Sequence, residues 1–97
     1  VVLLKGADTV VTSGSGSTYI NTTGNPGMAT GGSGDVLTGV ITAFAASGIA
    51  PLEAARAGAF VHGMAGDLAA GIMGQWGMTA TDIRDQLPAT LRGIVGK

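Results

Sequence analysis

The chain has 97 residues, of which 45% are hydrophobic and 11% charged, and its formal net charge at pH 7 is −1. Its five Lys and Arg residues are scattered, so the basic patch that nucleic-acid binding requires is missing. The absence of cysteine excludes disulfides and thiolate chemistry. The longest apolar run, 36–46, is too short to span a membrane. We therefore expect a cytoplasmic enzyme fragment with neither nucleic-acid nor membrane partners.

The apolar excess is high for so short a chain, because a small domain has a large surface relative to its core. We expect apolar faces that are covered by further chain or by another subunit, and hence a homo-oligomer. The missing initiator Met and the start inside the apolar run "VVLLKG" also favour an incomplete chain.

Three β-prone runs open the sequence. Residues 1–4 are continuously apolar, which predicts a buried strand of a sheet covered on both faces. Residues 9–12 and 17–21 predict two more strands, and the linker "SGSG" between them fits a hairpin turn. Pro26 and Gly27 then mark a turn in a glycine-rich segment.

From Asp35 onward, the apolar residues recur with the spacing of an α-helix. The apolar residues of this helix fall on one face: Val36, Leu37, Val40, Ile41 and Phe44. Gly48 fits a helix stop, and Pro51 fits the first turn of the next helix. That second helix, over 51–70, is apolar or small on nearly every side, which predicts a buried helix.

The C-terminal part predicts two shorter helices. Thr79 or Thr81 can cap the first of them. Pro88 either ends that helix or starts the last one, over 89–95. The predicted order is therefore a few β-strands followed by three to four α-helices.

Residues 31–35, Gly-Gly-Ser-Gly-Asp, stand directly before the first apolar helix. A helix start offers free backbone N–H groups and partial positive charge, and glycines let the backbone approach a bulky anion such as phosphate. The simpler alternative is a tight turn with a helix-capping aspartate. However, Asp35 stands in a run with almost no other charge, from 9 to 52. A carboxylate there is a poor phosphate ligand but a suitable base for a hydroxyl that attacks the phosphate.

Four segments carry a resemblance to a known family. The segment "NTTGNPGMATGGSGDVLTGVI" (21–41) resembles the signature of ADP- or ATP-dependent NAD(P)H-hydrate dehydratases, in the ribokinase-like superfamily. The segments "KGADTVV" (5–11), "AARAGAFVHGMAGDLA" (54–69) and "TATDIRDQLP" (79–88) resemble other parts of that family. The resemblance implies an α/β, ribokinase-like fold. Residues 1–97 are then the C-terminal part of a single domain of this fold, and the N-terminal half of that domain is absent.

The resemblance also implies a repair reaction on hydrated NADH or NADPH. The ring hydroxyl is phosphorylated by ADP or ATP, phosphate leaves, and the reduced dinucleotide is restored. By family pattern Asp35 is the catalytic base and contacts the hydrate, while Gly32, Ser33 and Gly34, next to Gly31, form the anion hole. Mg²⁺ is carried by the nucleotide, so no protein metal site is implied. The adenine-nucleotide site is lined by Lys5, Gly6, Ala7, Asp8 and Thr9, with Asn25 to Thr30 nearby.

Two other functions are also compatible with the sequence. A ribokinase-like kinase acting on a vitamin precursor or a sugar alcohol needs the same loop, although segment 21–30 argues against it. A non-catalytic assembly module would suit the apolar excess and predicts no nucleotide binding.

Several candidate residues have plainer interpretations. His62 lies in the middle of a helix among small and apolar residues, so we expect a hydrogen-bonded packing histidine. Asp67 is expected to be a structural partner. Without the resemblance, Lys5 would be a solvated strand-end residue and Asp8 a turn cap. Core or interface positions are expected for Met64, Met73, Trp76 and Met78.

Overall fold

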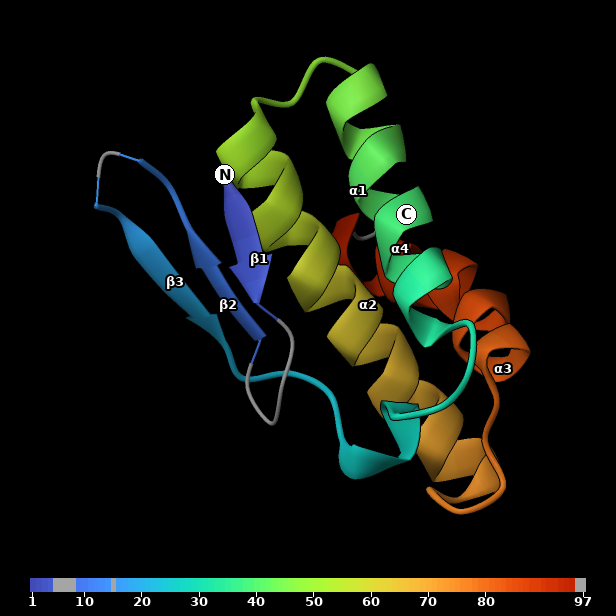
Figure 1. Cartoon of the computed structure of the whole chain (residues 1–97). Helices are drawn as coiled ribbons and strands as arrows, with labels where there is room; N and C mark the ends of the chain where they lie inside the picture. Colours follow the sequence, from blue (N-terminus) through green and yellow to red (C-terminus); the bar gives the residue numbers. More distant parts are fainter. Residues whose placement is uncertain (5–8, 15, 96–97) are drawn as a thin grey trace.

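The computed structural model describes residues 1–4, 9–14 and 16–95. Within these ranges, a three-stranded sheet precedes four α-helices, as the sequence predicts. The longest helix, α2, lies between the sheet on one side and the other three α-helices on the other (Figure 1). The elements are β1 (Val2–Leu4), β2 (Thr9–Thr12), β3 (Thr18–Asn21), the 3₁₀ helix η1 (Pro26–Met28), α1 (Ser33–Ala46), α2 (Pro51–Met73), α3 (Ala80–Asp85) and α4 (Leu87–Val95).

The sheet is antiparallel with the order β1-β2-β3, and the predicted hairpin joins β2 to β3. Because side chains alternate along a strand, each face of the sheet has its own residues. Leu3, Val11 and Tyr19 form the inner face, which packs against Ala55 and Ala59 of α2.

The outer face of the sheet is open. Val2, Leu4 and Ile20 are each more than half exposed. The prediction that the first strand is buried between two layers is therefore wrong for this structure. The apolar run correctly indicated a strand, but helices cover only one face of the sheet.

Helix α1 presents the predicted apolar face to α2, with Leu37 buried and its apolar neighbours half-buried. It begins two residues before the predicted start at Asp35. Helix α2 begins at Pro51 as predicted and continues three residues beyond the expected end, to Met73. Ten of its residues are buried, which confirms the predicted buried helix, although Phe60, Leu68 and Ile72 remain exposed.

Glycines of α2 allow neighbouring segments to come very close. A side chain at Gly58 would collide with Ile41 of α1, and one at Gly63 or Gly66 would collide with Thr23 or Met28. The segment between β3 and α1 is therefore packed directly against the backbone of α2.

The last two helices complete a second core around Ile83, which is fully buried. Thr79 caps α3 through a capping box with Asp82, as expected for one of the two candidate threonines. Pro88 is the second residue of α4, so this helix begins at Leu87, two residues before the predicted start. None of the helices described here combines the length and the apolar character needed to cross a membrane.

Candidate functional site

Asn25 anchors the segment that leads from the sheet to α1. Its Oδ1 accepts a hydrogen bond from the Gly27 amide at 3.0 Å and thereby caps η1. Its Nδ2 donates to Asp67 Oδ1 at 2.9 Å and to the Gly66 carbonyl at 3.1 Å. Asp67 also accepts the Gly24 amide at 3.1 Å, so its predicted role as a structural partner is confirmed. The interaction of Asn25 with a nucleotide stays a prediction.

The predicted anion loop forms a tight turn at the start of α1. Gly32 caps the helix with φ +89°, a left-handed conformation that favours glycine. The Ser33 amide donates to the Thr30 carbonyl, and the Asp35 amide donates to the Gly32 carbonyl. Within the described part of the chain the Gly34 amide has no acceptor. This amide, at the positive end of the helix, can bind an external anion.

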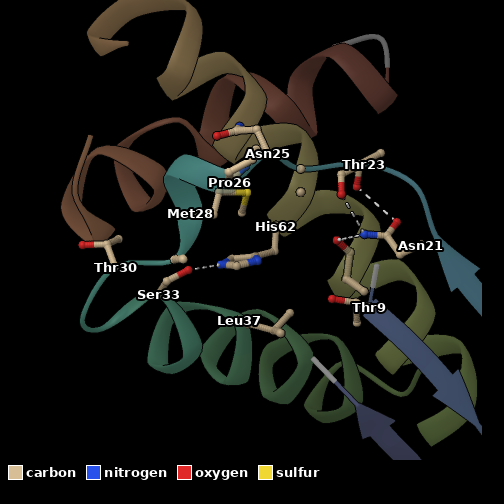
Figure 2. Close-up of a pocket in the computed structure, with 14 residues that line it drawn as sticks. Thr9, Asn21, Thr23, Asn25, Pro26, Met28, Thr30, Ser33, Leu37 and His62 are labelled. Carbon is tan, nitrogen blue, oxygen red and sulfur yellow. Dashed lines mark hydrogen bonds between the residues drawn. The ribbon is translucent and has the colours of Figure 1, made fainter. Parts of the chain in front are cut away.

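A pocket of about 730 Å³ lies between α1, α2 and the segment that joins β3 to α1 (Figure 2). Three of the predicted site residues line it, namely Thr9, Asn25 and Ser33. The rest of its wall includes Asn21, Thr23, Leu37 and His62. The pocket therefore combines several hydrogen-bonding side chains with apolar surface, as ligand sites do.

Ser33 and His62 meet inside this pocket. Ser33 Oγ lies 3.3 Å from His62 Nε2, and both residues are buried. Figure 2 shows the imidazole ring reaching from α2 across the pocket to the first turn of α1. The prediction of a buried, hydrogen-bonded histidine is confirmed. Sequence reasoning did not identify its partner, because no local pattern links positions 33 and 62.

Asn21 and Thr23 form a second polar contact between the pocket wall and α2. Asn21 Nδ2 donates to the Ala59 carbonyl at 3.1 Å, and Thr23 Oγ1 lies 3.1 Å from both the Phe60 carbonyl and Asn21 Oδ1. Tyr19 donates its hydroxyl hydrogen to Asn21 Oδ1. The sequence analysis did not single these residues out, although they belong to the segment that carries the resemblance.

Asp35 lies on the first turn of α1 with an exposed side chain, and it does not line the pocket. Successive helical residues are rotated by about 100°, so Asp35 lies nearly opposite Ser33 on the helix. The structure therefore places the predicted base and the pocket on different sides of the same turn.

The structure describes only some of the other predicted site residues. Gly31 and Gly32 form the exposed turn before α1. Lys5, Gly6, Ala7 and Asp8 lie outside the described residues. In the ranges that are described, no group of three or more His, Cys, Asp or Glu residues is arranged to hold a metal ion.

The fold matches that of a solved structure, Bacillus subtilis YxkO, a member of the UPF0031 family. The match has a TM-score of 0.89 and 31% sequence identity, and it covers 94% of this chain and 34% of YxkO. Together with the glycine turn at the start of α1, it defines an α/β protein of the ribokinase-like class.

The sequence comparisons identify the family within this class. A family model described as NAD(P)H-hydrate dehydratase matches residues 1–89, and the chain belongs to that family. The bifunctional NAD(P)H-hydrate repair enzyme Nnr of Moorella thermoacetica is 56% identical over 94 residues, which are 97% of this chain and 18% of that enzyme. The ADP-dependent (S)-NAD(P)H-hydrate dehydratase of Xanthomonas campestris pv. campestris is 43% identical over 91 residues, or 94% of this chain and 32% of that enzyme. The matched residues thus span 18% and 32% of the lengths of these two relatives.

Proposed function

We propose that this chain forms the nucleotide-binding side of an enzyme that repairs hydrated NADH or NADPH with ADP as the phosphoryl donor. The family supports the reaction, and the name of the Xanthomonas relative supports ADP. The observation that carries the proposal is the glycine turn at the start of α1, with its Gly34 amide directed to no acceptor within the described residues. ATP is the alternative donor.

The nucleotide is proposed to occupy the pocket, with its phosphates at the turn. Thr9 and Ser33 lie on the pocket wall and offer hydroxyl groups to the ligand. The amide of Gly34 and the partial positive charge of the helix start stabilise the negative charge of the transferring phosphoryl group. Mg²⁺, bound to the nucleotide phosphates, would supply further neutralisation of that charge.

Asp35 is proposed to act from the opposite side of the turn. Its carboxylate takes the proton of the ring hydroxyl, whose oxygen then forms a bond to the terminal phosphorus of ADP while the bond to the AMP leaving group breaks. Phosphate next leaves the ring with the C–O bonding electrons. The adjacent ring carbon loses a proton to solvent, and its C–H electrons form the ring double bond that restores the reduced dinucleotide. The exposed position of Asp35 is compatible with a substrate held by a part of the protein outside this chain.

The test is a chimera in which this chain replaces the matching segment of the Xanthomonas relative. With ADP, Mg²⁺ and hydrated NADH we expect the absorbance of NADH to return and AMP and inorganic phosphate to accumulate. Phosphorus NMR distinguishes this outcome from a kinase reaction, because a kinase leaves a stable phosphate ester. A folded chimera that makes such an ester, or that does not act on the hydrate, would contradict the proposal.

A further inference from the structure

His62 is the buried side chain through which α2 reaches the glycine turn. The residue is only 6% exposed, and its Nε2 lies 3.3 Å from Ser33 Oγ. Ser33 is itself only 4% exposed and is the first residue of α1. The contact therefore joins the middle of the longest helix to the turn that is proposed to bind phosphate.

Few contacts with other elements hold the turn: Gly32 lies close to Ala80 of α3, and the backbone hydrogen bonds of the turn are local. A side chain at Gly31 would meet no other atom within 4 Å. Gly32 has no side-chain capping bond. Among the described residues, the Ser33–His62 bond is the side-chain hydrogen bond that connects residues 31–34 to another element. Because glycines have large conformational freedom, such a turn needs an external tether to keep one conformation.

His62 is well placed to serve as that tether, because α2 is closely packed around it. The neighbouring Gly63 lies against the backbone of Thr23, and Gly58 lies against Ile41 of α1 itself. The imidazole therefore starts from a closely packed backbone position on α2 and reaches Ser33 in the turn (Figure 2).

We propose that His62 is a positioning residue: by holding Ser33, it keeps the glycine turn in the conformation that presents the Gly34 amide to the phosphate of the nucleotide. This inference rests on the proposed function, since it concerns the same turn. It assigns His62 no contact with the reacting atoms. The turn binds well only if its conformation is already formed, because ordering it on binding would reduce the affinity.

The experiment measures ADP affinity by isothermal titration calorimetry, with Mg²⁺ present, for the whole 97-residue chain and its variants. His62→Leu keeps an apolar side chain but removes the hydrogen bond. His62→Gln keeps an amide group near the position of Nε2. Val61→Ala is the matched control, because Val61 is equally buried on the same helix but does not line the pocket. Melting temperatures are recorded for every variant.

We expect His62→Leu to weaken ADP binding about ten-fold, the order expected for one buried hydrogen bond that orients a site. His62→Gln should restore most of the affinity, and Val61→Ala should lower the melting temperature without changing the affinity. Ser33→Ala should weaken binding at least as much as His62→Leu does, because it also removes a hydroxyl group from the pocket wall. If His62 acts through Ser33, His62→Leu should have no further effect in the Ser33→Ala background.

Equal affinities of the His62→Leu and unchanged chains, or losses that add in the double variant, would overturn the inference. If His62→Leu does not unfold cooperatively, the ADP affinities of Ser33→Ala and His62→Gln are compared instead. Equal affinities of these two variants would overturn the inference. ADP binding that is lost in Gly34→Val but insensitive to His62 would refute the tether and leave the proposed function intact. Failure of the unchanged chain to bind ADP would overturn both.

Discussion

Replacing Gly63 by alanine tests whether the close contact between α2 and the pocket wall is essential to the fold. A Cβ atom at this position would collide with Thr23 Oγ1 and would lie 2.8 Å from the Thr23 carbonyl carbon. The second contact matters most, because a backbone atom cannot move away by a change of rotamer. The segment around Thr23 would have to shift as a whole.

The expected loss can be estimated from three contributions. Overpacking a closely packed site typically costs about 1–3 kcal/mol. A shift of Thr23 would also weaken its hydrogen bond to the Phe60 carbonyl, by about 1 kcal/mol. The better helix propensity of alanine returns about 1 kcal/mol. The net destabilisation of about 2 kcal/mol corresponds to a fall in melting temperature of roughly 10 °C for a domain of this size.

Thermal unfolding followed by circular dichroism measures this fall. Gly71→Ala is the matched control, since Gly71 is exposed on the same helix and a side chain there would meet no atom within 4 Å. This control should raise the melting temperature slightly. If Gly63→Ala and Gly71→Ala melt at the same temperature, the backbone contact at Thr23 is not as close as the structure indicates, and the reasoning is refuted.

Three further predictions concern the site and the apolar surface. In the chimera with the Xanthomonas relative, Asp35→Asn should lower turnover by about 10²–10⁴-fold while ADP still binds, because the carboxylate is the proposed base. Near-normal turnover would remove Asp35 from the mechanism. Gly34→Val should strongly weaken ADP binding in calorimetry while it lowers the melting temperature only slightly, since a Cβ obstructs the approach of phosphate to the backbone. An unchanged ADP affinity would contradict the anion-binding turn. Static light scattering should show that the 97-residue chain self-associates through its exposed apolar residues, such as Leu4 and Ile72; a monodisperse monomer would contradict this.

Local patterns in the sequence were sufficient to predict most of the secondary structure. The β-prone runs gave the hairpin, the apolar spacing after Asp35 gave the buried face of α1, and Thr79 gave a helix start. Each of these signals acts within one or two turns of the chain, so each is visible without knowledge of the fold.

Contacts between distant residues could not be predicted in the same way. Ser33 meets His62, and Asn25 meets Asp67, only because glycines of α2 bring that helix close to the glycine-rich segment. The exposure of Leu4 likewise depends on which face of the sheet the helices cover. An apolar run indicates that a strand forms, but it does not show how many layers surround it.

The first turn of α1 directs two of the predicted site residues to opposite sides of the helix. Ser33 faces the pocket, while Asp35, two residues later, faces outward. A single inserted or deleted residue would rotate every following side chain by about 100° and would bring the carboxylate toward the pocket wall. The distance along the chain between the two side chains is thus as important as their identity. Any exchange of segments between this chain and its relatives has to preserve that spacing if Ser33 is to stay on the pocket wall and Asp35 is to stay outside the pocket.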